Sequence, residues 1–144
     1  MAEIYGVELV TSVFGSWPSF HDAEVVSLRV ERTRTYESGP CLLADVHVFE
    51  MTADIDSRGY YVLRNHTLVS IQFDGVEDLE LTGFNNQNVI SELVFQNIGT
   101  AAFPDPAWQV SFDGIHGVTA GFRCREITII SVRPWNVDTG APAA

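Results

Sequence analysis

The spacing of apolar positions changes once along the chain, from a helical period to strict alternation. Residues 3–14 predict one short amphipathic helix that ends at Gly15, because their apolar side chains recur every three or four positions. These side chains belong to Ile4, Val7, Val10, Val13 and Phe14. After residues 16–19, which are typical of a turn, apolar and polar residues alternate, as they do in half-buried β-strands.

The alternating part of the chain predicts about eight strands. Residues 23–34 and 41–51 are expected to form a hairpin around a turn at residues 37–40, and residues 60–73 a long third strand. Five further strands are expected at residues 77–81, 89–98, 108–113, 118–124 and 127–132. The sequence therefore predicts a mainly β fold of mostly antiparallel strands, in a sandwich or one strongly curved sheet, with one short N-terminal helix.

Length and composition predict one soluble domain. A chain of 144 residues is enough for a single core, so we expect one domain over residues 1–133 and a loose C-terminal tail over residues 134–144. No apolar run approaches the ~20 residues of a membrane-spanning helix. The first residues lack the basic and apolar regions of a secretory signal, so a cytoplasmic location is expected.

Charge narrows the function classes. The chain has 19 acidic and eight basic residues, a formal net charge of -11, and the eight basic residues are all arginine. Chemistry that needs a lysine, such as Schiff-base formation or a P-loop, is therefore excluded. An acidic protein repels a phosphate backbone, so nucleic acid is not expected as a ligand, and a basic protein partner is.

The densest cluster of polar residues lies in residues 17–24, which we call the 17–24 segment. Alternation would place Asp22 and Glu24 on the same face as the apolar residues Val26, Leu28 and Val30, with His21 on the other face. Carboxylates on a core-facing row can act as an acid and base pair or bind a divalent cation. Alternatively, they accept backbone hydrogen bonds or pair with arginine, which is the commoner arrangement.

The other histidines and the cysteines suggest no catalytic centre. Asp45 and His47 share a strand face, but a metal site would need a ligand from another strand. Cys41 and Cys124 lie far apart in the sequence and are expected to be buried side chains. Nucleophile and phosphate-binding motifs are absent as well. We therefore predict no catalytic residue, no metal and no cofactor. A small metal-dependent hydrolase that uses His21, Asp22 and Glu24 is the alternative.

Acidic and amide side chains gather in the middle of the chain and suit a basic protein partner. The alternative is a solvated acidic face that only keeps the protein soluble. The candidate partner-binding residues are Trp17, His21, Asp22, Glu24, Asp74, Glu77, Asp78, Glu80, Asn85, Gln87 and Asn88.

Three motifs resemble the immunity protein 50 family of bacterial polymorphic toxin systems. They are WPSFHDAEV at residues 17–25, GFNNQNVI at residues 83–90, and HG at residues 116–117 with FRC at residues 122–124. The likeness spans about residues 12–133. It implies a small cytoplasmic β-rich protein that binds and neutralises a toxin encoded beside it. It leaves open whether the 17–24 segment contacts the toxin or holds the sheet together.

The charge pattern suggests how such a protein would act. An acidic face around residues 74–80, together with Asp22 and Glu24, would cover a basic active-site cleft on a nuclease-like toxin, in the place of a phosphate backbone. A third alternative is a non-catalytic scaffold that forms a homodimer through an exposed strand edge.

Overall fold

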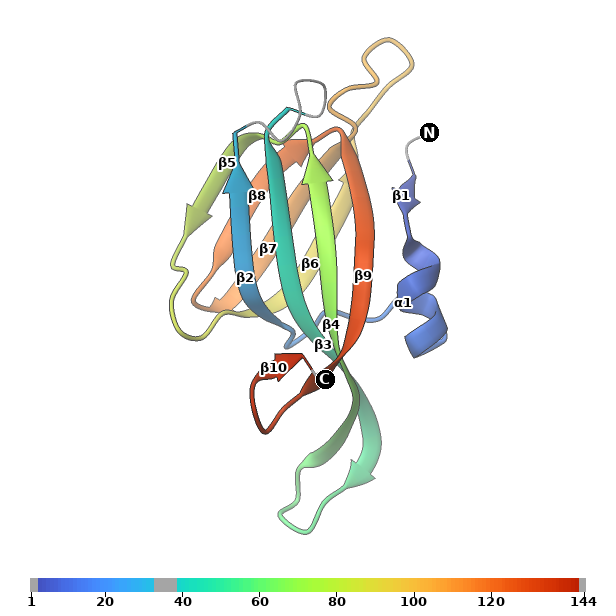
Figure 1. Ribbon diagram of the computed structural model, residues 1–144, viewed down its shortest axis with the longest axis vertical. Coiled ribbons are helices and arrows are strands. Elements are labelled where there is room, and N and C mark those ends of the chain that lie inside the picture. The colour runs from blue at the N-terminus through green and yellow to red at the C-terminus, as the bar shows by residue number, and fades with distance from the viewer. Residues whose placement is uncertain (1–2, 33–38, 143–144) are drawn as a thin grey trace.

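The computed structural model describes residues 3–32 and 39–142, and this part of the chain forms ten strands and one helix (Figure 1). In chain order they are β1 (Ile4–Tyr5), α1 (Val7–Phe14), β2 (Glu24–Glu31), β3 (Cys41–Ile55), β4 (Tyr61–Asp74), β5 (Glu77–Thr82), β6 (Val89–Asn97), β7 (Trp108–His116), β8 (Thr119–Cys124), β9 (Glu126–Asn136) and β10 (Ala141–Pro142). The mainly β prediction is confirmed. Residues 33–34 of the first predicted strand and residues 37–38 of the predicted turn lie outside the described residues.

The strands form one continuous sheet that folds over on itself. Their order is β1-β9-β4-β3-β2-β6-β7-β8-β5, with β10 added to β9. The β1–β9 pair is parallel, and the other pairs in the described chain are antiparallel. Between β2 and β6 the register contains one residue pair, Glu24 with Val89, and the sheet turns over at this junction. Its two halves then lie face to face, as Figure 1 shows.

The core fills the space between the two halves. Phe73 of β4 is fully buried, and its ring lies 5.0 Å from that of Phe122, 6.0 Å from that of Phe95 and 6.2 Å from that of Phe112, centroid to centroid. These partners come from β8, β6 and β7, in the opposite half of the sheet. Each fully buried aromatic side chain of this kind contributes about 1.5–3 kcal/mol to folding. The aromatic cluster therefore joins the two halves.

The N-terminal helix begins later than the spacing predicts. Residues 4–5 pair with β9 as β1, and Gly6 turns the chain into the helix at a φ of 80°. A Cβ at Gly6 would lie 2.3 Å from the carbonyl oxygen of Ile129, so this close approach requires glycine. The helix ends at Gly15, as predicted, and buries Val10 against the sheet. In residues 3–32 and 39–142, no helix is long and apolar enough to cross a membrane.

Asp22 and Glu24 were expected to share a face with the apolar residues of the following strand. This prediction is wrong, because β2 contains a bulge. The register with β3 shifts between Val25 and Ser27, so Val26 is an extra residue and the alternation changes phase there. Before the bulge, Ala23 and Val25 are buried at 1% exposure. Glu24 lies between them and faces away from the core. It therefore does not share a face with Leu28, which pairs with a buried residue of β3.

The alternation predicted that Val26 and Val30 lie on the core face, but neither of them is buried in the core. Val26 and Val30 are 36% and 49% exposed. Val26 is the bulge residue, and Val30 lies in the part of β2 that has no partner in β6.

Part of the segment predicted as a loose tail is β-structure. Strand β9 runs to Asn136, and Pro142 of β10 pairs with Trp135. The side chain of Asn136 accepts hydrogen bonds from the backbone N–H groups of Asp138 (2.9 Å) and Thr139 (3.2 Å). These bonds close the turn between β9 and β10.

Candidate partner-binding surface

Aromatic contacts hold the 17–24 segment against the sandwich. The half-buried ring of Trp17 lies 5.5 Å from the ring of Phe20 and 6.2 Å from that of Phe95, and Phe20 is buried. His21 and Asp22 follow, with side chains 59% and 42% exposed and an Nε2 to Oδ1 distance of 3.6 Å. Asp22 has a φ of 64° in this turn. The apolar part of the segment thus anchors a polar turn that faces solvent.

The amide loop, residues 83–88, is closed by its own side chains. Asn88 is 4% exposed, and its Oδ1 accepts a hydrogen bond from the N–H of Asn85 (2.9 Å) while its Nδ2 donates to the carbonyl of Asn85 (2.8 Å). The Oδ1 of Asn85 in turn accepts from the N–H of Gln87 (2.9 Å). Asn88 is therefore a structural residue of the loop, whereas Asn85 and Gln87 are exposed.

The structure brings the 17–24 segment and the amide loop together. The N–H of Val25 donates to the carbonyl of Asn88 (2.8 Å), and the N–H groups of Asp22 and Ile90 donate to the carbonyls of Ile90 and Ala23, both at 2.9 Å. Two groups of predicted residues, more than 60 positions apart in the sequence, thus lie at the same end of the sandwich. Sequence order alone contains no signal for this pairing.

The acidic row, which we define as Asp74, Glu77, Asp78 and Glu80, lies elsewhere. Asp74 pairs with Cys41 at the start of β3, whereas Glu24 pairs with His47, six residues further along. At a rise of ~3.3 Å per residue, the two positions are about 20 Å apart. Glu77, Asp78 and Glu80 lie on β5, which pairs with β8 and not with β2. The acidic row and the 17–24 segment are therefore separate clusters, not one face.

Members of the acidic row differ in their surroundings. Asp74 is 7% exposed, and Nε2 of Gln72 donates to both of its carboxylate oxygens (3.2 and 3.0 Å). Glu77 and Asp78 pair with Arg123 of the neighbouring β8, the first at 3.5 Å. These two residues and Glu80 are exposed on β5, the last strand of the sheet order. The accessible charge of the row therefore lies on a sheet edge.

One cluster of aromatic and imidazole rings was missed by the sequence analysis. Nε2 of His47 lies 2.9 Å from Nδ1 of His66, and the His47 ring stacks on Trp135 with centroids 5.2 Å apart. Burial, with a smaller effect of His66, lowers the pKa of His47 to about 4. Burial also lowers the pKa of His66. The pair is therefore neutral near pH 7, and its members lie too far apart in the sequence to be associated by spacing.

Asp45 and His47 share the outer face of β3, as predicted, but their side chains have different partners. The carboxylate of Asp45 accepts hydrogen bonds from the hydroxyls of Ser27 (2.8 Å) and Ser70 (2.5 Å) and so links three strands. Among the described residues, no group of three or more His, Cys, Asp or Glu side chains is placed to hold a metal ion. The hydrolase alternative, with His21, Asp22 and Glu24, therefore has no ligand set in this part of the chain.

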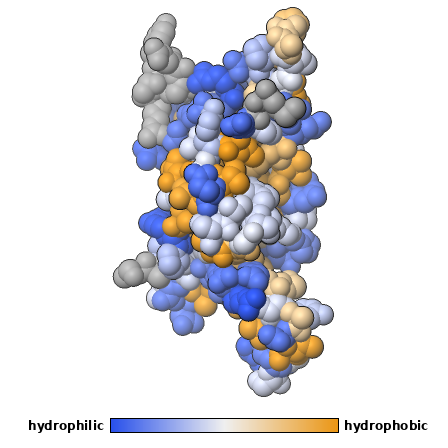
Figure 2. Space-filling view, turned by 90° about the vertical axis from the view of Figure 1, so that its right-hand side faces the viewer, coloured by the Kyte–Doolittle hydropathy of each residue, from blue (hydrophilic) through white to orange (hydrophobic). Residues whose placement is uncertain are grey.

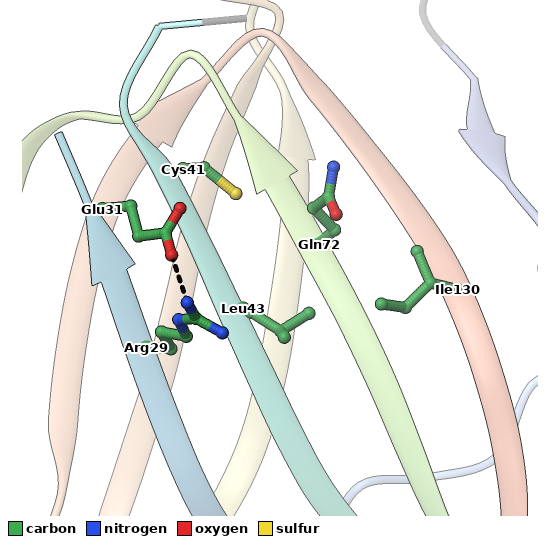
Figure 3. A pocket seen from close by; sticks show the side chains of 6 residues that line it. All are labelled: Arg29, Glu31, Cys41, Leu43, Gln72 and Ile130. Carbon is green, nitrogen blue, oxygen red and sulfur yellow. Dashed lines mark ion pairs between the residues drawn. The ribbon is translucent and has the colours of Figure 1, made fainter. Parts of the chain in front are cut away.

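A shallow hollow opens on the outer face of the sheet, across β2, β3, β4 and β9 (Figure 3). Its lining residues are Arg29, Glu31, Cys41, Leu43, Gln72 and Ile130. The guanidinium of Arg29 pairs with Glu31 at 2.6 Å, so these opposite charges neutralise each other. The hollow thus combines an ion pair with apolar side chains, the amide of Gln72 and the thiol of Cys41.

Comparison with known proteins identifies a family. The family model described as Immunity protein 50 matches residues 6–135. No curated protein and no solved structure matches the chain. The matched range contains the 17–24 segment, the amide loop and the acidic row.

Proposed function

Because the chain belongs to the immunity protein 50 family, we propose that it binds a cognate protein toxin in the cytoplasm and neutralises it without catalysis. The observation that carries this proposal is the family match over residues 6–135, which spans nearly the whole sandwich. Exposed carboxylates and amides at one end and one edge of the sheet support a binding role. Electrostatic attraction to such groups selects a partner with a basic face.

We assign the contacts to the exposed and half-buried polar side chains and not to the buried ones. Three of the candidate residues have a structural role, because their side chains pack or form hydrogen bonds within the chain: Trp17, Asp74 and Asn88. The proposed contacts are His21, Asp22, Glu24, Glu77, Asp78, Glu80, Asn85 and Gln87. Because they form two separate clusters, either cluster alone can cover a basic active-site cleft, and the experiment below distinguishes them.

The first experiment is a protection assay. The toxic domain encoded beside this gene is expressed in cells with and without the protein, and surviving colonies are counted. The proposed function predicts rescue together with a stable complex of the two purified proteins. A lethal neighbour that the protein neither rescues nor binds would contradict the proposed function.

Matched charge variants then locate the contacts. The pair Asp22→Asn and Glu24→Gln tests the 17–24 segment, and the pair Glu77→Gln and Glu80→Gln tests the acidic row. The control pair Glu3→Gln and Glu8→Gln removes the same charge from exposed N-terminal positions. We expect the affinity to fall at least ~10-fold for the cluster that contacts the toxin, and less than ~3-fold for the control. Equal effects of all three pairs would indicate attraction by net charge alone.

A further inference from the structure

The hairpin of β3 and β4 extends beyond the body of the sandwich. In Figure 1 the ends of these two strands leave the other strands and project from the lower end of the molecule. We call this projection, residues 51–63, the arm. Two cross-strand pairs define its register, Met51 with Leu63 and Ile55 with Tyr61.

One face of the arm is apolar and exposed. Residues directly opposite each other in an antiparallel pair share a face, and so do residues two apart on one strand. The register shifts on β3 between Met51 and Ile55, but Tyr61 and Leu63 are two apart on β4 and so place both pairs on one face. Met51, Ile55, Tyr61 and Leu63 are 51%, 63%, 57% and 38% exposed. In Figure 2 the projecting lobe at the lower end carries hydrophobic residues on its surface. A contiguous exposed apolar face of this kind marks an interaction site.

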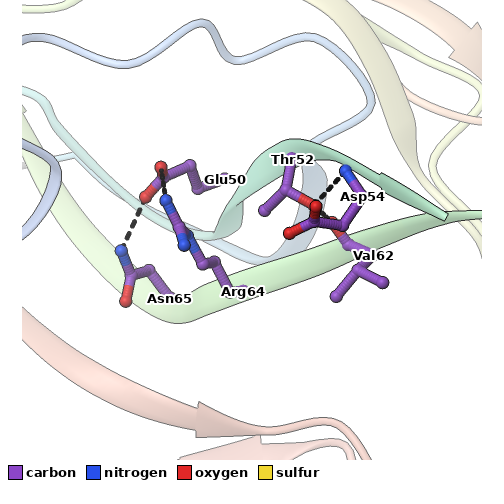
Figure 4. A network of polar contacts seen from close by, with 6 residues as sticks. All are labelled: Glu50, Thr52, Asp54, Val62, Arg64 and Asn65. Atoms are coloured by element: carbon purple, nitrogen blue, oxygen red, sulfur yellow. Dashed lines mark hydrogen bonds and ion pairs between the residues drawn. The ribbon is translucent and has the colours of Figure 1, made fainter. Parts of the chain in front are cut away.

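Polar contacts hold the base of the arm, and one further contact lies within the arm itself (Figure 4). Nη2 of Arg64 pairs with Oε1 of Glu50 at 2.9 Å, and Nδ2 of Asn65 donates to the other carboxylate oxygen at 2.7 Å. The hydroxyl of Thr52 donates to the carbonyl of Val62 at 2.7 Å. These bonds fix β3 and β4 to each other at the base of the arm and at Thr52.

The tip of the arm is also held by hydrogen bonds. Oδ1 of Asp56 accepts from the N–H groups of Arg58 (2.8 Å) and Tyr60 (3.1 Å), and Gly59 adopts the φ of 86° that the turn requires. An arm that is ordered before binding loses little conformational entropy when a partner covers it. The apolar face of the arm is therefore already ordered before a partner binds.

We propose that the apolar face of the arm docks into an apolar groove of the toxin that is bordered by basic residues. The arm contains Asp54 and Asp56 against one basic residue, Arg58, so its net charge is negative and a partner with positive charge beside its apolar groove complements it. A second copy of this chain, with a net charge of -11, would bring the same acidic groups and be repelled. The basic toxin is thus the occupant that the charges favour.

The arm is continuous with the 17–24 segment. A hollow lined by Ser19, His21, Phe49, Glu50 and Met51 joins the base of the arm to this segment. The toxin can therefore contact the arm and the polar turn at the same end of the molecule. This inference rests on the proposed function and adds the arm as the apolar part of the interface. Aromatic and large apolar side chains dominate binding energy, while charged residues at the rim steer association.

The test measures the affinity for the purified toxic domain encoded beside this gene, inactivated by substitution at its own active site. Ile55→Thr and Tyr61→Thr, separately and together, remove apolar contact from the arm but keep residues that favour strands. Val62→Thr, on the opposite face and 38% exposed, is the matched control. We expect the double variant to bind at least ~30-fold more weakly, and the control within ~3-fold of the wild type.

The outcomes separate this inference from the proposed function. Unchanged circular dichroism and denaturation midpoint verify that each variant is folded, and the single variants keep the test available if the double variant is not. If the wild type binds the toxin and a folded double variant binds it equally well, the inference fails and the proposed function stands. An unchanged toxin affinity with loss of a homodimer would reassign the arm to self-association. If the wild type itself does not bind, both fail.

Discussion

Nε2 of His47 lies 2.9 Å from Nδ1 of His66, so one imidazole donates a hydrogen bond to the other across β3 and β4. This arrangement requires the accepting nitrogen to be unprotonated. The neighbouring rings of Phe49 and Trp135 bury the pair and disfavour a charge on it. Burial therefore favours the neutral form of both histidines.

The histidine pair makes stability depend on pH. The pKa of His47 falls from 6.5 to about 4 on folding, first because of burial and then because of His66. Between these values the unfolded chain binds more protons than the folded one, so the free energy of unfolding decreases as pH is lowered through this window. Urea denaturation at several pH values measures it. The variant His47→Phe keeps a ring on Trp135 but cannot titrate, so its free energy of unfolding is expected to change less with pH than that of the wild type. Equal pH dependence in the two proteins would contradict the assignment of this effect to His47.

Salt dependence tests the electrostatic part of toxin binding. Exposed charges are screened beyond ~10 Å at 0.1 M salt and beyond ~3 Å at 1 M salt. We expect the association rate to fall at least ~10-fold between low and high salt, while the dissociation rate changes less, because the apolar arm is not screened. Stopped-flow or surface-binding kinetics provide both rates. An association rate that is indifferent to salt would argue against steering by the acidic clusters.

Gly117 supports the amide loop through close approach. A Cβ there would lie 2.1 Å from the carbonyl oxygen of Gln87 and 2.7 Å from Oδ1 of Asn88, at a φ of 78°. Gly15 has a similar φ of 80° but nothing within 4 Å. We expect Gly15→Ala to cost ~1–2 kcal/mol of backbone strain. Gly117→Ala adds a steric clash and should cost more. Equal denaturation midpoints for the two variants would show that the loop moves aside freely.

Phe73 tests the junction between the two halves of the sheet. It is fully buried and contacts aromatic rings from the opposite half, so Phe73→Ala leaves a cavity and is expected to cost ~3–5 kcal/mol. Phe103, 77% exposed, is the control, and Phe103→Ala should change stability by less than ~0.5 kcal/mol. Equilibrium denaturation compares them. A small effect at Phe73 would mean that the two halves are stabilised independently.

Much of the fold follows from the sequence, because alternation reports directly on which residues are buried. Residues 23–34 and 41–51 were predicted as a hairpin, and β2 and β3 pair antiparallel. The long strand expected at residues 60–73 corresponds to β4 (Tyr61–Asp74). The additional strands β1 and β10 have two residues each, too few for a period to be visible. The resemblance to the immunity protein 50 family is confirmed by the family match.

The errors have a common cause in backbone geometry. The bulge at Val26 reverses the faces of β2, so Glu24 does not continue the apolar row. Gly6 ends β1 and begins the helix, which shortens the helix predicted from the N-terminal spacing. A bulge or a single positive φ changes direction within one residue, and hydrophobic spacing over a longer window does not detect it.

The sequence by itself determined the chemistry of this protein: an acidic, lysine-free, mainly β chain with the motifs of its family and with carboxylates, amides and aromatic residues in particular segments. Only the tertiary structure decided which segments meet. It bonded Val25 to Asn88 of the amide loop and placed Glu77, Asp78 and Glu80 on a sheet edge. It also brought His47 to His66 and Trp135 and projected the arm away from the core. The reason is that burial pattern and charge are properties of single positions, whereas register and strand order depend on pairing between residues far apart in the chain.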